Sequence, residues 1–268
     1  MEQFMITERC GTLRMLGREA LRGKWVTAFC AYMVYNAAIT FPTLLISMLF
    51  KPVTSELISS LYVILITGPL TLGCSIFALS IFRNEQASIG QIFYGFERFG
   101  KALGLSLLIT LFIILWFLIP VAGVVLCIMA ALRYSQAFFV MADNPDMGVQ
   151  ECIARSKQLM INNKAKLFLL LLSFIGWALL ASVPSLLLGA FTGNNIINSF
   201  SLEAIATYTP SMGYTIVDFV LSAGYFALMA YVWATLAAFY EMAAGYLRPG
   251  SITSIASTAE IIDENNVQ

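Results

Sequence analysis

Six long apolar segments, with nearly all of the basic residues on one side of them, constrain this sequence more than any other feature. A run of about 18 or more apolar residues is long enough to cross a bilayer as an α-helix. The chain has six such runs, at about 25–50, 57–82, 102–119, 121–142, 166–190 and 213–243. The sequence therefore predicts an all-α, polytopic integral membrane protein with six transmembrane helices.

The basic residues predict which side of the membrane each loop lies on. If the chain alternates through six spans, only Lys51 falls on one side and Arg133 lies inside a span. The other thirteen bases fall together on the opposite side: Arg9, Arg14, Arg18, Arg22, Lys24, Arg83, Arg98, Lys101, Arg155, Lys157, Lys164, Lys166 and Arg248. Loops rich in Lys and Arg stay in the cytoplasm. We therefore expect this side, with both chain termini, to be cytoplasmic.

Composition excludes several classes of function. Hydrophobic residues make up 59% of the chain and charged residues 11%, against about half and a quarter in a soluble domain. There is no histidine, the commonest metal ligand and general base. The five cysteines form no CxxC pair, and no GxSxG, HExxH or P-loop motif is present. We expect a non-enzymatic protein without a cofactor or metal.

The clustered bases have a simple interpretation in a membrane protein. Lys and Arg near the inner surface attract anionic lipid headgroups, so we expect membrane lipids at the cytoplasmic face as partners, and no nucleic acid. A second membrane protein is a further partner that the sequence allows. The sequence divides into a cytoplasmic N-terminal amphipathic segment (1–24), a six-span membrane domain (25–247) and a partly disordered cytoplasmic tail (248–268).

Three amphipathic segments precede the three outward-going spans. They cover Thr12–Lys24, Ile89–Lys101 and Asp146–Met160, the last with Asp146 as its expected N-cap. Amphipathic helices with a basic polar face lie in the headgroup plane of a membrane. The pattern fits three consecutive units, each an interfacial helix followed by a transmembrane hairpin. It also fits any protein with an even number of spans and basic inner loops.

Two charged residues stand out within the spans. Arg133 lies inside the fourth span, and Glu241 lies near the cytoplasmic end of the sixth, beside a stripe of Ala230, Ala234 and Ala238. Small residues let helices approach closely, so we predict an intramembrane ion pair between Arg133 and Glu241. The alternatives are a snorkelling Arg133 with an interfacial Glu241, or a solute pathway.

Weaker polar signals lie in two of the same spans. Asn36 is near the middle of the first span, and Tyr134 and Ser135 follow Arg133 in the fourth. Buried polar groups in lipid need internal partners, so each of these residues is a candidate intramembrane polar site.

Short phrases along the chain match a known family. They are Arg18–Trp25, Ile92–Phe96, Leu118–Pro120, Arg133–Ser135, Asp143–Pro145, Ser156–Met160, Leu172–Trp177 and Phe239–Glu241. On these phrases the sequence resembles the bacterial integral membrane family catalogued as domain of unknown function 975, found mostly in Gram-positive bacteria. The family usually has Ile-Pro-Gly at the outer turn, whereas this chain has Ile119-Pro120-Val121-Ala122-Gly123. The resemblance implies a multi-pass protein of the bacterial cytoplasmic membrane and nothing catalytic.

Two classes of function remain open at the level of sequence. In the first, the protein is a non-enzymatic membrane component that binds lipid or another membrane protein. In the second, it is a transporter or permease subunit for a small or amphipathic solute. A polar cavity reaching Arg133, Asn36 or Tyr134 would favour transport, and a dry interior would favour the first class.

Overall fold

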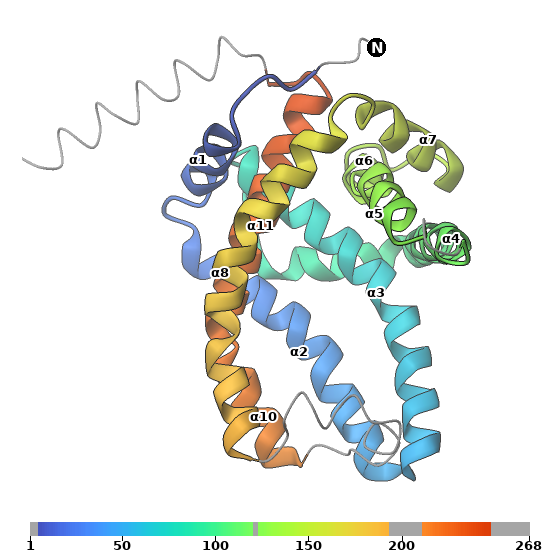
Figure 1. Ribbon diagram of the computed structural model, residues 1–268, viewed down its shortest axis with the longest axis vertical. Helices are drawn as coiled ribbons and strands as arrows, with labels where there is room; N and C mark the ends of the chain where they lie inside the picture. The colour runs from blue at the N-terminus through green and yellow to red at the C-terminus, as the bar shows by residue number, and fades with distance from the viewer. Residues whose placement is uncertain (1–4, 120–122, 193–210, 248–268) are drawn as a thin grey trace, which may run out of the picture.

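The computed structural model describes residues 5–119, 123–192 and 211–247, and the regular secondary structure in these ranges is entirely helical. The predicted tail, 248–268, lies outside the described residues. The helices are α1 Cys10–Ala20, α2 Trp25–Leu49, α3 Pro52–Phe82, the 3-10 helix η1 Ile89–Arg98, α4 Phe99–Phe117, α5 Gly123–Tyr134, α6 Ala137–Asp143, α7 Val149–Leu159, α8 Lys164–Phe191, α10 Met212–Leu221 and α11 Ala223–Ala243 (Figure 1).

Six helical segments in the described part of the chain are long and apolar enough to cross a membrane, as the sequence predicted. They are Trp25–Leu49, Pro52–Phe82, Ile89–Phe117, Gly123–Asp143, Lys164–Phe191 and Ala223–Ala243. Large apolar side chains such as Leu115, Leu179 and Leu187 are more than half exposed along them. Apolar surface on this scale is typical of contact with lipid. The chain is a multi-pass membrane protein.

Two of the expected spans are interrupted by a serine. The fourth breaks at Ser135 into α5 and α6, and the sixth breaks at Ser222 into α10 and α11. The Ser135 hydroxyl donates to the Leu132 carbonyl at 2.9 Å, and the Ser222 hydroxyl donates to the Asp218 carbonyl at 2.9 Å. Such a bond competes with the helical ladder, although Ser106 and Ser173 make it within unbroken helices.

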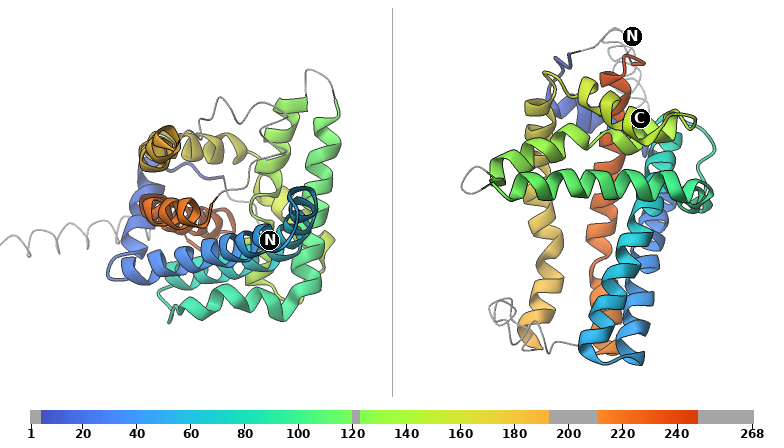
Figure 2. Two further views of the ribbon diagram at one scale, coloured as in Figure 1. Left: turned by 90° about the horizontal axis from the view of Figure 1, so that it is seen from below. Right: turned by 90° about the vertical axis from the view of Figure 1, so that its right-hand side faces the viewer.

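The helices run in two directions. The long helices α8 and α11 lie against each other along the long axis of the molecule. The hairpin of α4 and α5 runs across that direction (Figure 2, right). Helices α1, α6 and α7 lie at the same end of the long helices, opposite the turn between α2 and α3, with α1 on one side of α8 and α11 and with α6 and α7 on the other (Figure 1). We call the end that carries α1, α6 and α7 the basic end.

The junctions of the first and third units have the same geometry. Helix α1 passes into α2 through the turn 21–24, and α7 passes into α8 through the turn 160–163. In each turn the third residue is left-handed, with φ of 75° at Gly23 and 65° at Asn162. The second unit differs, because η1 leads directly into α4. The matched turns support a repeated helix–turn–helix at the start of the first and third units.

The N-terminus of α7 corrects one expectation. The N-cap is Gly148 rather than Asp146, and its backbone N–H donates to Glu151 Oε2 at 2.9 Å. The Glu151 carboxylate therefore supplies the N-terminal contact that the sequence assigned to an aspartate.

Each amphipathic helix packs on a helix that returns to the basic end. Helix α1 packs on α11, where a Cβ at Gly17 would lie 2.9 Å from the Cα of Thr235. The 3-10 helix packs on α3, where a Cβ at Gly95 would overlap the carbonyl of Pro69. Helix α7 packs on α5 and α6, and Ser156 Oγ donates to the Arg133 carbonyl at 2.8 Å. Residues without bulk make these close approaches possible.

Candidate functional site

A charged cluster lies at the basic end, where α3, α6 and α11 meet. Arg83 is the C-cap of α3, Asp143 is the last residue of α6, and Glu241 lies two residues before the end of α11. Helices α3 and α11 return to the basic end in the first and third hairpins, and α6 ends the second hairpin, which runs across them (Figure 1 and Figure 2). The three units therefore each contribute one charged residue to a single cluster, although these residues are far apart in the sequence.

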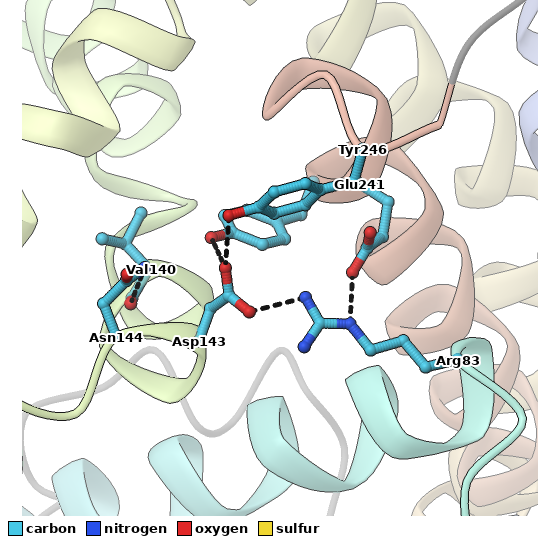
Figure 3. A network of polar contacts seen from close by, with 7 residues as sticks. Arg83, Val140, Asp143, Asn144, Glu241 and Tyr246 are labelled. Atoms are coloured by element: carbon cyan, nitrogen blue, oxygen red, sulfur yellow. Dashed lines mark hydrogen bonds and ion pairs between the residues drawn. The ribbon is translucent and has the colours of Figure 1, made fainter. Parts of the chain in front are cut away.

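Arg83 bridges the two carboxylates. Its Nη2 donates to Asp143 Oδ1 at 2.6 Å, and its Nε donates to Glu241 Oε1 at 2.7 Å (Figure 3). The carboxylate side chains are 10% and 8% exposed, against 32% for the arginine. The guanidinium is planar, with donors in a fixed fork, so one side chain holds both acids at a defined separation.

Two tyrosines complete the hydrogen bonding of Asp143. The hydroxyl groups of Tyr240 and Tyr246 donate to Asp143 Oδ2 at 3.0 and 3.1 Å. The Arg83 guanidinium carbon also lies 5.8 Å from the centre of the Tyr246 ring, within the range of a cation–π contact. Asp143 thus accepts from three side chains that come from α3, from α11 and from the residues after α11.

The pKa values of the outer members follow from these contacts. Burial alone would lower the pKa of Arg83, but its hydrogen bonds and the negative charges of Asp143 and Glu241 raise it above the ordinary value. Arg83 therefore stays charged. Burial raises the pKa of Tyr246, and the adjacent Asp143 carboxylate adds to the effect, so Tyr246 remains a hydrogen-bond donor at neutral pH.

The members of the cluster bond to one another. Arg83 and both tyrosines donate within it (Figure 3). Within the described ranges, no group of three or more His, Cys, Asp and Glu residues could hold a metal ion. This arrangement fixes the ends of α3, α6 and α11 against one another, and we call it the Arg83 latch.

The ion pair predicted between Arg133 and Glu241 does not form. Glu241 is bonded to Arg83, and Arg133 is exposed on α5, with no salt bridge to any described residue. The small residues Ala230 and Ala234 of α11 pack in a core with residues of α2 and α3. Two of the three alanines of the stripe therefore receive other helices, while Ala238 lies in a core that includes residues of α5 and α6.

The remaining candidate polar residues have separate local partners. Asn36 Nδ2 donates to the carbonyl of Tyr32 on its own helix at 2.8 Å. Tyr134 is 5% exposed and packs against Phe112, with ring centres 5.7 Å apart. Ser135 receives a hydrogen bond of 3.3 Å from Gln136 Nε2. The structure does not gather Asn36, Tyr134 and Ser135 into one polar site.

Two lysines that were predicted only to lie on the cytoplasmic side also hold loops in place. Lys24 Nζ donates to Asn84 Oδ1 at 2.8 Å, in the loop after α3. Lys101 Nζ donates to the Pro145 carbonyl at 2.9 Å, with the carbonyls of Asp146 and Met147 at 3.4 Å, in the loop after α6. Each lysine therefore ties the start of a hairpin to its end.

An apolar groove lies between α5 and α8. It has a volume of about 340 Å³, and its walls include Ile128, Leu132 and Ser135 on the α5 side and Phe168, Leu172 and Ile175 on α8. We call it the α5–α8 groove. Ser135 is its one polar wall residue, so this groove, whose walls include the neighbours of Arg133 and Tyr134 in the sequence, is apolar.

Comparison with known proteins gives a family and no activity. A family model described as "Protein of unknown function (DUF975)" matches two stretches, residues 7–132 and 123–245, which together cover most of the chain. No curated protein and no solved structure matches the chain.

Proposed function

Because the chain belongs to the DUF975 family, whose description assigns no activity, we propose a function from the surface of the protein. In this proposal it is a non-enzymatic component of the bacterial cytoplasmic membrane that binds anionic lipid at its basic end. In this proposal the basic end faces the cytoplasm, in line with the positive-inside rule. Binding of a second membrane protein at the same end is the related possibility that the experiment below also reports.

One observation carries this proposal: exposed cations at the basic end adjoin an apolar exterior. Arg18, Arg133 and Lys157 are exposed, while leucines such as Leu179 and Leu187 of α8 are exposed farther along the same bundle. Cations above an apolar belt match the anionic headgroups and acyl chains of an inner leaflet. Each base near such a surface contributes about 1 kcal/mol of attraction.

The interior supports a binding role over a conducting one. The Arg83 latch closes its donors and acceptors on themselves, and Asn36 bonds to its own helix. The α5–α8 groove, which adjoins Ser135, is apolar. A route for a hydrophilic solute would need polar groups facing an open path.

Purification in mild detergent with native mass spectrometry tests the proposal. We expect the protein, extracted from membranes that contain phosphatidylglycerol and phosphatidylethanolamine, to retain phosphatidylglycerol in excess over its share of the bulk lipid. A protein free of lipid, or one with lipid in bulk proportions, would contradict lipid binding. A second polypeptide retained without lipid would favour the protein-binding form.

Transport is the second candidate, and the break between α5 and α6 favours it. Gln136 lies at this break with no exposed surface, and its Oε1 has no hydrogen-bond partner among the described residues. Discontinuous helices form the substrate sites of many transporters. A cysteine at position 136, in a variant lacking the five native cysteines, would react with a small hydrophilic thiol reagent if a polar path reaches it. The lipid-binding proposal expects no reaction.

A further inference from the structure

The α5–α8 groove has the dimensions and lining of a seat for a hydrocarbon chain. Its volume is about 340 Å³ and all but one of its wall residues are apolar. Successive α8 wall residues, Phe168, Leu172 and Ile175, lie three or four positions apart and so follow one face of the helix. The groove therefore extends along α8, away from the basic end where α8 begins.

Cations stand at the end of this groove nearest the start of α8. Lys164 lies four residues before Phe168, on the same face of α8 and one turn closer to the basic end. Arg133 follows the wall residue Leu132 on α5, and its side chain is exposed. Lys157 of α7 is nearby, with Nζ 5.6 Å from the centre of the Tyr134 ring.

Neither Arg133 nor Lys164 forms a salt bridge with an acid among the described residues. Two cations that flank an apolar groove without a salt-bridge partner are available to an anion that enters from the membrane surface. An anion there would be attracted by both charges.

We propose that one anionic phospholipid binds here, with its phosphate between Arg133 and Lys164 and an acyl chain in the α5–α8 groove. The charge of the site selects a phosphate that carries no compensating amine, and the groove requires that a hydrocarbon chain be attached to it. This inference rests on the proposed function and specifies the site and the lipid. Lys157 contacts the rings of Phe112 and Tyr134 and so holds α7 against α4 and α5.

Photo-crosslinking locates the lipid without any substitution at the site. The full chain is placed in nanodiscs of phosphatidylcholine with phosphatidylglycerol that carries a diazirine in one acyl chain. After irradiation and digestion, we expect the lipid adduct on α8 between Phe168 and Ile175, or on α5 between Ile128 and Leu132. Adducts spread evenly over the exposed residues of α2, α4 and α8 would overturn the site.

Two variants then separate the two halves of the site. Replacing both cations (Arg133→Gln with Lys164→Gln) is expected to lower the retention of phosphatidylglycerol about 25-fold, from about 5-fold for each base. Ala131→Trp places an indole in the groove and is expected to exclude the acyl chain while leaving both charges in place. Arg133→Lys is expected to retain the lipid. Unchanged retention in the first two variants would overturn the proposal.

Matched controls distinguish failure of the site from failure of the proposed function. Arg9→Gln with Arg18→Gln removes two exposed bases from the N-terminal part of the chain, and Leu179→Trp adds an indole to α8 outside the groove. Neither is expected to change the adduct.

If the wild type retains phosphatidylglycerol but the controls and site variants lose it equally, the site is wrong and the general function stands. If the wild type retains none, both fail. Competition by inorganic phosphate alone, unaffected by Ala131→Trp, would show that the ligand is not a lipid.

Discussion

The Nε of Arg83 donates to Oε1 of Glu241 at 2.7 Å across 158 residues of sequence. With the bond from the same guanidinium to Asp143, it connects the helices that end the first, second and third hairpins. These helices are otherwise held by apolar packing, which is weakly directional in a bilayer because lipid chains compete for the same surface. The Arg83 latch supplies the directional contact.

Substitution of Arg83 is expected to destabilise the protein more than loss of any exposed base. Arg83→Gln leaves Asp143 and Glu241 as two nearly buried carboxylates without their shared counter-ion. We expect a loss of about 2 kcal/mol, the usual range for a hydrogen bond to a charged group, with allowance for the partial exposure of the arginine. Thermal unfolding in detergent, followed by circular dichroism, measures it.

Arg18→Gln is the matched control for that experiment, because Arg18 is exposed on α1. Its midpoint of unfolding should stay within the error of the wild type. An Arg83→Gln protein that unfolds at the same temperature as Arg18→Gln would show that the latch contributes nothing measurable.

The contribution of Tyr246 is expected to disappear at alkaline pH. Its hydroxyl donates to Asp143, and burial raises its pKa above the unfolded value, which is about 10. A raised folded pKa gives stability that is complete below the unfolded pKa and is lost as the pH rises through the folded one. Because Tyr246 is itself 53% exposed, solvent competes with this hydrogen bond. Tyr246→Phe should therefore be less stable than wild type by about 0.5 kcal/mol at pH 8, and this difference should close above pH of about 10.

Unfolding midpoints measured from pH 7 to pH 11 check this expectation. Tyr94→Phe, which alters an exposed tyrosine of η1, is the control and should follow the wild type throughout. A deficit of Tyr246→Phe that stays constant over the whole range would mean that the hydroxyl contributes through packing rather than through its proton.

The spans could be predicted from sequence because they depend on local properties. Length and apolar composition alone placed the helices that end at Leu49, Phe82 and Phe191 within a few residues. The breaks at Ser135 and Ser222 could not be placed in the same way. A serine hydroxyl that bonds back to a carbonyl does not decide the break by itself, because Ser106 and Ser173 make the same bond inside the unbroken helices α4 and α8. Where the helix breaks depends on its neighbours in the fold.

The charged cluster was predicted only in part. Glu241 was identified because an acid near the end of an apolar run needs a partner, but the partner was assigned from depth and helix faces. Its partner in the structure, Arg83, comes directly after a span. A basic residue at that place is already explained by the cytoplasmic side of the membrane, so the sequence does not mark it as the partner of an acid. The choice between Arg83 and Arg133 depends on which helices pack on α11, and that is a tertiary property.

A single methyl group at Gly95 is expected to disrupt the packing of η1 on α3. A Cβ at this position would overlap the Pro69 carbonyl, which belongs to the backbone and cannot turn away. We expect Gly95→Ala to lower the stability by about 3 kcal/mol, at the upper end of the usual cost of overpacking. Gly100→Ala in the same region is the control, since a Cβ there meets no atom within 4 Å. Equal unfolding midpoints for the two variants would contradict the close approach.

The direction of α4 gives a prediction about depth in the membrane. Because α4 runs across α8 and α11, spin labels at Leu107 and Phe117, both exposed on α4, should report similar depths. Labels at Leu169 and Leu179 on α8 have the same spacing and are also exposed. Their depths should differ by up to about 15 Å, from a rise of about 1.5 Å per residue. The relative accessibility of each label to oxygen and to a water-soluble nickel chelate measures its depth. A difference on α4 as large as that on α8 would mean that α4 crosses the bilayer parallel to α8.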